Sequence, residues 1–585
     1  MKKFILGVLC GLAFAGLAGV IIAFAAIRMG GEKPVAVSDN SVLVLKLDGE
    51  IPEKPPVDMP FPFLEQQPSI TMLELWSTIN RAGDDARIKA ILLEPRNVGV
   101  GWANLEEIRQ QLLKFRKKGK LVYASLHTPG TREYYLATAA DKIYIAPEDH
   151  IDVKGLRIES SYWKGTLDKV GVQVEIEHAG RFKDFGDQYS RTSMTPETRE
   201  VLNGFLDQLY GSMVNVIAEG RKKTPDQVRA LIDQGPFLAK KAKEFGLVDV
   251  LAYNDEVEEQ LKGALKLSEL KKTSLKTYSK AKLPGAATPK KRIAFLVADG
   301  GISGDMNLDP ADDVTAPAMV KLMKDIEKDE SISGVIFRVN SPGGDALASD
   351  LMLHQARILS KKKPMIISMA DYAASGGYMI SMTGDTVLSY PNTITGSIGV
   401  VYGKGNLRGL YDKIGMNKEI LTRGRFAAID SEYVPMDAAA REKLRESILA
   451  TYDSFLQVVA EGRKQKKEDI APKAEGRAWT GSQAKQQALV DELGGLDRAL
   501  EMIKAKAKID ANEKVGIVAY PQRKSFVEQW LQRNQGEEAL APVIDKAVIE
   551  KTFKAVFPTA AERSWVRTYM RGGMMSVSPY LIEIR

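Results

Sequence analysis

The sequence predicts an α/β protein made of two tandem copies of one βαβ domain, preceded by a single transmembrane helix. Three observations predict this fold class: an internal repeat, an alternation of short apolar runs with longer amphipathic runs, and an uncharged N-terminal stretch. The chain has 585 residues, of which 44% are hydrophobic and 27% charged. This length exceeds what one core can organise, and the composition is typical of a globular protein. We therefore expect several packed domains.

The repeat is visible when the chain is aligned with itself. The segment 91-ILLEPRNVG-99 matches 335-VIFRVNSPG-343, and 134-YYLATAADKIYIAP-147 matches 378-YMISMTGDTVLSYP-391, both at a shift of 244 residues (343 minus 99). A constant shift over such a length predicts a tandem duplication. The units we expect are an N-terminal anchor (1–28), a first repeat (41–262), a basic linker (263–292), a second repeat (293–510) and a C-terminal extension (511–585).

Each repeat alternates strand-like and helix-like segments. Short β-branched runs bounded by turn residues predict buried strands in the second repeat, at 293–299, 334–340, 365–370 and 386–391. Apolar residues at helical spacing predict a helix over 346–360 with His354 on its buried side. The residues that define this stripe are Leu347, Leu351, His354 and Ile358. Strands that alternate with helices imply a mostly parallel sheet covered on both faces.

The N-terminal stretch from Phe4 to Ile27 carries no charge. As a helix it can cross a bilayer core of about 30 Å. A cleaved secretory signal with 23-AFA-25 before the cleavage site is the alternative, but the run is longer than a usual signal core, which favours an uncleaved anchor. Because Lys2 and Lys3 precede the span, we expect a cytoplasmic N-terminus and the bulk of the chain on the outer side of a bacterial inner membrane.

The charge is concentrated in one segment. The chain carries a net +7, and 262–292 alone holds ten Lys or Arg and one acidic residue, a net +9. A basic surface that follows phosphates is therefore absent from the rest of the chain, and we expect no nucleic-acid partner. Attraction of this segment to membrane lipid is the functional alternative to a merely solvated linker. Cys10 is the only cysteine, and no metal or nucleotide motif is present, so no cofactor is predicted.

The two copies differ most in three loops. The first is 340-NSPGGD-345, where the other copy has 96-RNVGVG-101. Paired glycines between a strand and a helix let the backbone turn sharply and present N–H groups, which suits an oxyanion hole. The second loop surrounds Ser375, which precedes two glycines and an apolar helix and corresponds to Thr131. A hydroxyl at such a junction is a candidate nucleophile.

The third loop appears twice, as 180-GRFK-183 and 424-GRFA-427. Because the second copy carries Ala427, the local fold does not require a lysine at this position. None of the four histidines occurs in a loop that resembles a Ser-His-Asp site. A serine needs an adjacent base, and a lysine serves when burial disfavours its charge. We therefore predict Ser375 as nucleophile and Lys183 as base, one from each repeat. The duplication favours a pair within one chain, although a pair shared between chains stays open.

The order of membrane anchor, GRFK, NSPGGD, SGGYMIS and TGSIG resembles the signal peptide peptidase A (protease IV) family in its long two-repeat form. The NSPGG loop is also similar to that of the proteolytic subunit of Clp protease. The resemblance implies a Clp/crotonase-like fold and a serine endopeptidase with a Ser-Lys dyad. It implies Ser397 as the residue that orients Lys183, and Gly344 and Gly376 as oxyanion donors. Asp184 and Phe185 depart from the small residues expected after the lysine.

The same resemblance implies apolar peptides, among them cleaved signal peptides, as substrates and a ring-like homo-oligomer, for which we expect a tetramer. Two alternatives remain open from the residues themselves. One is an acyl-CoA enzyme of the crotonase type, which usually relies on acidic residues in its cleft. The other is a non-catalytic membrane scaffold, which would tolerate the loss of both Ser375 and Lys183.

Overall fold

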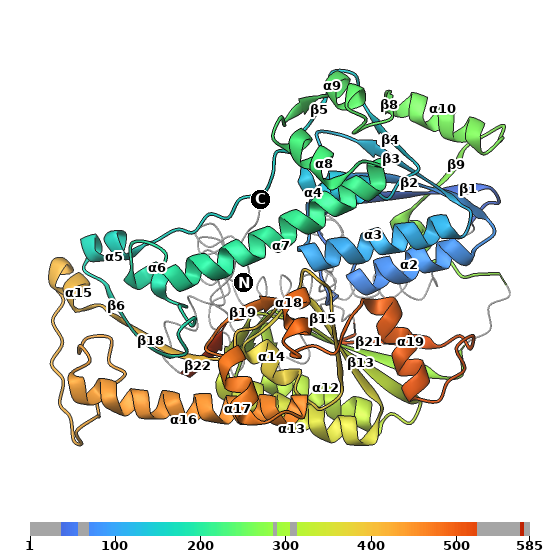
Figure 1. Ribbon diagram of the computed structural model, residues 1–585. Coiled ribbons are helices and arrows are strands. Elements are labelled where there is room, and N and C mark those ends of the chain that lie inside the picture. Colours follow the sequence, from blue (N-terminus) through green and yellow to red (C-terminus); the bar gives the residue numbers. More distant parts are fainter. Residues whose placement is uncertain (1–36, 56–69, 285–288, 305–312, 523–573, 578–585) are drawn as a thin grey trace, which may run out of the picture.

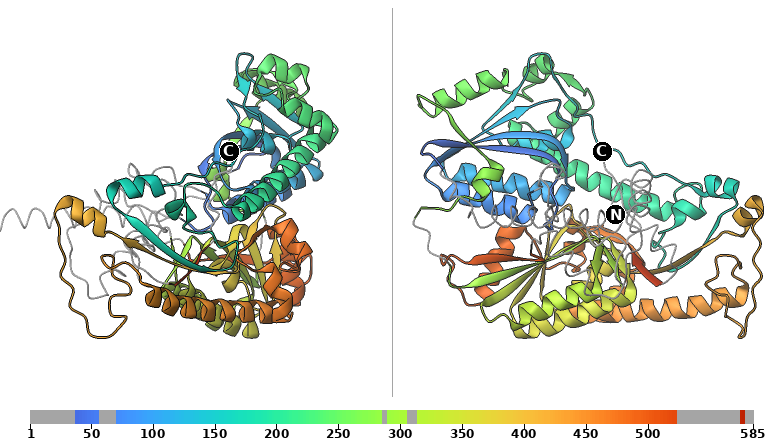
Figure 2. Two further views of the ribbon diagram at one scale, coloured as in Figure 1. Left: turned by 60° about the vertical axis from the view of Figure 1, so that its left-hand side comes forward. Right: turned by 180° about the vertical axis from the view of Figure 1, so that it is seen from behind.

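The computed structural model describes residues 37–55, 70–284, 289–304, 313–522 and 574–577. The transmembrane helix predicted over 4–27 lies outside these residues. Within the described ranges, no helix combines the length and the apolar character needed to cross a membrane. The α/β class predicted from the sequence is confirmed, because the described chain forms two mainly parallel sheets with helices around them (Figures 1 and 2).

The first sheet belongs to the first repeat, and all its neighbouring strands are parallel. Its strands, in spatial order, are β8 (Val250–Leu251), β4 (Lys142–Ile145), β3 (Leu121–Leu126), β2 (Ile88–Gly99), β1 (Ser41–Glu50) and β9 (Lys271–Ser274). The helices of this half are α2 (Met72–Asp84), α3 (Trp102–Lys117), α4 (Thr131–Ala137), α5 (Lys164–Val170), α6 (Asp187–Ser190), α7 (Pro196–Arg221), α8 (Pro225–Ile232), α9 (Ala239–Glu244), α10 (Asn254–Ala264) and α11 (Leu275–Ser279). A two-stranded ribbon joins β5 (His150–Ile151) and β7 (Phe237–Leu238). Both faces of the sheet are covered, one by α10 and the other by α2, α3, α4 and α7.

The second sheet belongs to the second repeat. Its main path, in spatial order, is β19 (Ala478–Thr480), β17 (Ile394–Gly396), β15 (Met365–Ala374), β13 (Ile332–Ser341), β10 (Arg292–Asp299) and β21 (Gly516–Tyr520). Off this path, β16 (Thr386–Ser389) pairs with β15, and β20 (Glu492–Leu493) pairs with β16. The helices are α12 (Ala316–Lys328), α13 (Ala346–Lys362), α14 (Gly376–Ile380), α15 (Arg408–Ile414), α16 (Ala438–Arg463), α17 (Lys467–Ile470), α18 (Gly481–Gln486) and α19 (Leu496–Lys506). One face packs against α12, α13, α14 and α16, and the other against α19.

A third sheet joins the two repeats. Its order is β12 (Asp313–Thr315), β11 (Gly301–Ser303), β14 (Gly343–Asp345), β22 (Met574–Val577), β18 (Val400–Asn406) and β6 (Gln173–Ala179). The strands β6 and β18 form two arms that extend from the two halves and pair along seven residues, antiparallel to each other (Figure 1). Because β6 comes from the first repeat and β14 from the second, this sheet brings loops from both repeats to one place.

The helix α13 faces the core with a different side from the one predicted. Leu347, Leu351 and His354 are exposed, so the prediction of a buried histidine was wrong. The buried face instead carries Ala348, Met352, Ala356 and Leu359. Both stripes have helical spacing, but small side chains allow the helix to approach its neighbours closely, and the face with two alanines forms the contact. Hydropathy alone does not distinguish these two faces.

The basic segment 263–292, expected to be a linker, contributes in part to the first domain. Within it, β9 adds a parallel strand to the edge of the first sheet beside β1. The helix α11 that follows buries Leu275 and Tyr278 in the first core. The segment alternates lysines with a few apolar residues, and burial of those few anchors it while the lysines stay in solvent.

Candidate active site

Lys183 and Ser375 lie side by side at the junction of the two repeats. The Lys183 Nζ is 2.8 Å from the Ser375 Oγ, although the residues are 192 positions apart in the chain. Both side chains have no solvent-exposed surface. The two residues that the sequence singled out from different repeats therefore meet within one chain.

Ser375 sits in a strained turn between β15 and α14. Its backbone has a φ of 55° and a ψ of −117°, a combination that residues other than glycine rarely adopt. Its N–H donates to the Gly396 carbonyl at 2.7 Å, which fixes the turn against β17. Such a strand-to-helix elbow sets a hydroxyl at the tip of a tight bend.

Ser397 completes the surroundings of the lysine. The Lys183 Nζ donates to the Ser397 carbonyl oxygen at 2.9 Å and is 3.1 Å from the Ser397 Oγ. A neutral amine has two N–H bonds and one lone pair. If both N–H bonds point at Ser397, the lone pair is left to face the Ser375 hydroxyl. Ser397 also has a positive φ, 51°, and its N–H donates to the Arg477 carbonyl at 2.8 Å.

The loop that carries Lys183 packs closely against the backbone of the second repeat. The Phe182 N–H donates to the Glu475 carbonyl at 2.8 Å, and the Phe182 ring is buried beside the guanidinium of Arg477, which lies 4.8 Å from the ring centroid. A Cβ added to Gly476 would lie 2.5 Å from the Lys183 Cβ, so glycine is needed there. These contacts hold the lysine in place.

Burial lowers the pKa of Lys183 well below its usual 10.5, and the nearby Asp184 carboxylate only partly opposes this shift. The direction follows from desolvation, because an ammonium that has lost its water is disfavoured relative to the neutral amine. Asp184 accepts a hydrogen bond from the Thr198 hydroxyl at the start of α7. The lysine amine is thus the form that this environment favours.

The glycine loop predicted as an oxyanion site lies directly beside the serine turn. A Cβ added to Gly344 would be only 2.0 Å from the Ile302 carbonyl oxygen. A Cβ added to Gly376 would be 3.2 Å from the Gly344 N and 2.6 Å from the Ser349 Oγ. Glycine at both positions therefore allows two backbone segments to approach each other next to Ser375.

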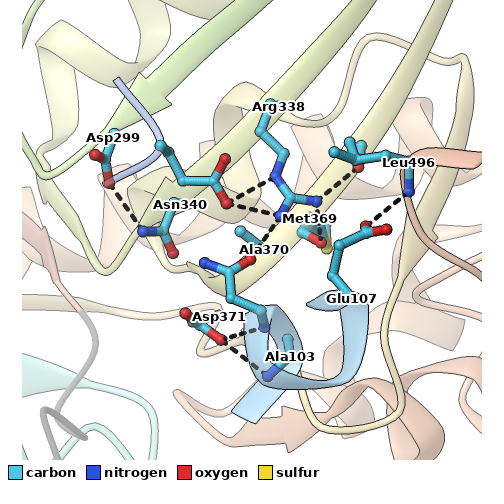
Figure 3. Close-up of polar contacts among 12 residues, drawn as sticks. Ala103, Glu107, Asp299, Arg338, Asn340, Met369, Ala370, Asp371 and Leu496 are labelled. Carbon is cyan, nitrogen blue, oxygen red and sulfur yellow. Dashed lines mark hydrogen bonds and ion pairs between the residues drawn. The ribbon is translucent and has the colours of Figure 1, made fainter. Parts of the chain in front are cut away.

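A buried polar network ties the strand β15 to the first repeat (Figure 3). The Asp371 carboxylate accepts hydrogen bonds from the N–H groups of Gly101, Ala103 and Asn104, at 3.0, 2.9 and 3.0 Å, at the start of α3. Burial raises the pKa of Asp371 to about 6. Asp371 lies four positions before Ser375, so this carboxylate holds the strand that leads to Ser375 against the other repeat. Sequence reasoning missed it, although an acid at the end of an otherwise apolar strand is a visible signal.

Arg338 forms the centre of the same network. Its guanidinium has no exposed surface and donates to Glu53 at 2.7 Å and to Asn104 at 2.7 Å, both from the first repeat. Removal of one partner from a buried ion pair leaves an uncompensated charge. We expect Arg338→Met to lower the free energy of unfolding by about 3–5 kcal/mol, measured by urea denaturation. The double variant Arg338→Met/Glu53→Leu should recover part of that loss, and an unchanged midpoint in the single variant would contradict the expectation.

In the second repeat, the Lys183 side chain fills a space beside Ser375 and Gly399, which we call the Lys183 socket. The first repeat has a cavity at the corresponding position. It measures about 650 Å³, and its lining includes Asn97, Thr131 and Gly155. Thr131 corresponds to Ser375, and Gly155 corresponds to Gly399, whose added Cβ would lie 3.1 Å from the Lys183 Cδ. The corresponding loop residue Ala427 is exposed at the far end of the second arm. In the described chain, the second GRF loop thus does not fill the cavity.

Comparison with known proteins identifies the family of the chain. The profile of peptidase family S49 matches the chain twice, at residues 114–268 and at residues 357–510. The chain belongs to peptidase family S49. The double match confirms the predicted duplication, and the family makes the protein a serine protease.

Several relatives of this S49 peptidase match over most of their length. The chloroplastic serine protease SPPA of Arabidopsis thaliana is 33% identical over 493 residues, which are 82% of this chain and 71% of that protein. Protease 4 of Salmonella typhi is 29% identical over 490 residues, 80% and 79% of the two chains. Protease 4 of Haemophilus influenzae is 28% identical over 522 residues, 85% and 84%. The family resemblance stated from the motifs is thereby confirmed.

Proposed function

We propose that this S49 peptidase is a membrane-anchored endopeptidase that uses Ser375 as nucleophile and Lys183 as general base. The observation that carries the proposal is the 2.8 Å approach of the buried Lys183 Nζ to the Ser375 Oγ. A serine hydroxyl is a weak nucleophile until an adjacent base accepts its proton. Burial lowers the pKa of Lys183 and so favours the neutral amine that this role requires.

The reaction would proceed in two halves. Lys183 takes the hydroxyl proton as the Ser375 Oγ attacks the peptide carbonyl carbon, and the N–H groups of Gly344 and Gly376 stabilise the negative oxygen. Lys183 then gives the proton to the leaving amine, which departs and leaves an acyl-enzyme. Water enters, and Lys183 takes one of its protons as the water oxygen attacks the ester carbonyl carbon. The bond to the Ser375 Oγ then breaks, Lys183 returns the proton to that oxygen, and the acid product leaves. Ser397 keeps the lysine lone pair directed at the reacting oxygen throughout.

The substrates we propose are apolar peptides, including leftover signal peptides. An apolar patch near the lysine contains Phe185, Val401 and the partly buried Ile176. Phe185 follows Lys183 by two positions in the chain. Segment 1–28 would hold the enzyme at the inner membrane with the catalytic part on the outer side, near such peptides. In this arrangement the anchor segment would contact the membrane lipid directly.

A fluorophosphonate probe tests this proposal against the crotonase-type and scaffold alternatives. The probe forms a covalent bond only with an activated serine. We expect labelling that mass spectrometry maps to Ser375, together with cleavage of an apolar peptide ester by the detergent-solubilised chain. An unlabelled chain, or labelling elsewhere with Ser375 unmodified, would contradict the proposal.

Self-association is part of the proposal, with a tetramer as the expected ring. The loop around Lys183 fills a socket in its own second repeat, whereas the corresponding loop around Ala427 is exposed and the corresponding socket near Thr131 is a cavity. The exposed region also carries Leu421, 94% exposed, and Ile414, 66% exposed. A second copy of the chain would pair the loop of one subunit with the cavity of the next, and such head-to-tail contacts close into rings.

Leu421→Asp should therefore reduce the oligomer mass measured by light scattering in detergent. A charge in the centre of an apolar contact is costly to bury, so we expect dissociation to the single chain at micromolar concentration. Leu449→Asp, a change at a half-exposed leucine on α16, serves as the matched control and should leave the mass unchanged. Equal masses for the native chain and Leu421→Asp would exclude this contact.

A further inference from the structure

The cavity of the first repeat corresponds to the active site of the second. At the shift of 244 residues, its lining matches the serine turn, the glycine loop and the segment around Gly399. Val153 takes the place of Ser397, and Ala427 takes the place of Lys183, so this copy lacks the counterparts of the proposed base and of the residue that orients it. A volume of about 650 Å³ is nevertheless retained, which is in the range of small-ligand sites. The space for a ligand therefore persists where the catalytic groups are missing.

The lining of this cavity is more cationic than that of the catalytic copy. At three positions the first repeat carries a cation where the second has an uncharged residue: Arg132 for Gly376, Lys154 for Ile398 and Arg157 for Val401. The second repeat forms the same fold without these charges, so the fold does not require them. Cationic side chains around a cavity favour an anionic ligand.

Two acids also line the cavity, and both are engaged within the protein. The Glu133 carboxylate accepts hydrogen bonds from the N–H groups of Val98 and Gly130, at 2.7 and 3.0 Å. Asp152 pairs with Lys154 at 2.8 Å, and the two side chains are 40% and 55% exposed. An ion pair that is this exposed contributes little, so a ligand carboxylate can replace Asp152 beside Lys154 at a small cost.

Two other lining residues offer N–H donors to an anion. Arg157 pairs with Glu159 through an exposed contact of 3.4 Å. Trp102 is 6% exposed, and within the described ranges its indole N–H has no hydrogen-bond partner. A buried donor without a partner is costly, and a ligand oxygen in the cavity is a partner of the required type. The catalytic copy has Ala346 at this position, so the donor belongs to the first copy alone.

The contact proposed between subunits leaves this space open. A loop of the next subunit that docks at the cavity would place Ala427 where Lys183 lies in the catalytic copy. There the Lys183 Cδ is 3.1 Å from a Cβ added to Gly399, which corresponds to Gly155. Because the alanine side chain ends at its Cβ, the volume beside Gly155 would stay available to a ligand.

We propose that this cavity is a second, non-catalytic peptide site, which binds the carboxylate of a peptide through Arg132, Lys154 and Arg157. The carboxylate belongs either to a free C-terminus or to an acidic side chain, and both have the same chemistry. Guanidinium and ammonium groups form strong, charge-assisted hydrogen bonds with carboxylates. A peptide is the ligand because the cavity retains the loop framework of a peptidase site. Binding here requires neither Ser375 nor Lys183, so this proposal and the proposed catalysis fail independently.

Peptide binding measured by fluorescence anisotropy tests the site. All chains carry Ser375→Ala to prevent cleavage, and one short apolar peptide is prepared with a free C-terminus and with a C-terminal amide. We expect the free acid to bind at least about 10-fold more tightly than the amide. In Lys154→Glu/Arg157→Glu this preference should disappear, because two cations are replaced by groups that repel a carboxylate. Arg229→Glu/Lys240→Glu, a matched change of two exposed, paired cations outside the cavity, should retain the preference.

A second pair of peptides, both amidated and differing only in one Glu or Gln, distinguishes the source of the carboxylate. A preference for the Glu peptide that is lost in Lys154→Glu/Arg157→Glu supports the site and assigns the ligand to acidic side chains. Equal affinity within both pairs would overturn the proposal, and this is also the result expected if the loop of the next subunit closes the cavity. A preference that persists in Lys154→Glu/Arg157→Glu would overturn it as well. If that variant has a lowered thermal midpoint, Lys154→Gln/Arg157→Gln provides the same comparison without added negative charge.

Discussion

Ser375→Ala is expected to lower kcat for an apolar peptide ester by about 10⁶-fold, to the background rate. In the proposed mechanism this hydroxyl forms the covalent bond to the substrate, so no other group replaces it. The N–H of residue 375 donates to the Gly396 carbonyl, and this backbone contact does not depend on the side chain. We therefore expect the alanine variant to keep the strained turn. Peptide hydrolysis followed by mass spectrometry measures this loss.

The folded state of Ser375→Ala should match that of the native chain, because the hydroxyl contributes one contact, to Lys183. Thermal unfolding and the oligomer mass provide the control. Cleavage of the ester at more than a thousandth of the native rate by a correctly folded Ser375→Ala protein would contradict the assignment of the nucleophile.

Lys183→Met is expected to lower kcat/KM by about 10²–10⁴-fold, the usual contribution of a general base. It should also raise stability. Because the folded pKa of Lys183 is lowered from 10.5, the unfolded chain binds more protons than the folded chain between the lowered pKa and 10.5. Stability conferred by this site therefore rises with pH across that window, and burial of the lysine is unfavourable near neutral pH. Methionine fills a similar volume without that cost. Activity assays and thermal unfolding at pH 7 measure the two effects.

Lys404→Met is the matched control for the lysine. Lys404 is also buried, on β18, but its Nζ donates to the backbone carbonyls of Ile429, Ser431 and Val434 rather than meeting a serine hydroxyl. Its replacement should lower stability, because three carbonyls lose their donor, and should leave most of the activity. A similar loss of activity in both variants would indicate that Lys183 acts only through the fold.

Mixing Ser375→Ala with Lys183→Met tests whether the site is formed within one chain. The 2.8 Å contact lies within a single chain, so each variant lacks one member of the proposed Ser375–Lys183 pair. The mixture should stay as inactive as its components after co-refolding. Recovery of activity would show that lysine and serine can come from different chains.

Much of this arrangement could be predicted because the chain contains its own comparison. Because the two repeats align at a shift of 244 residues, the strands expected in one repeat predict those of the other. The second copy has Ala427 in place of Lys183, which indicates that the lysine serves a chemical role rather than the fold. The strands around Ser375 are β-branched and bounded by turns, so their order follows from local signals. The meeting of Lys183 with Ser375 rests instead on β6 and β18, whose pairing across the repeats has no local signal.

The features that could not be predicted depend on long-range packing. The choice between the two stripes of α13 is made by how closely alanines let the helix approach its neighbours, which Leu347 and Leu351 do not reveal. The role of Asp371 depends on the start of α3, far away in the sequence. β22 is four residues long and is stabilised by pairing with β14 and β18 and by the packing of Met575 against Phe185 and Val401. These partners are far away in the sequence, and nothing in the composition of β22 indicates a strand.

The most direct test of the central claim is the pH dependence of fluorophosphonate labelling at Ser375. If Lys183 is the base, the labelling rate of the native chain should rise with pH and reach a plateau at an apparent pKa far below 10.5, following the neutral amine. In Lys183→Met the rate should be slow, and that inflection should be absent. The same inflection and the same plateau rate in Lys183→Met and in the native chain would contradict a Ser375–Lys183 dyad.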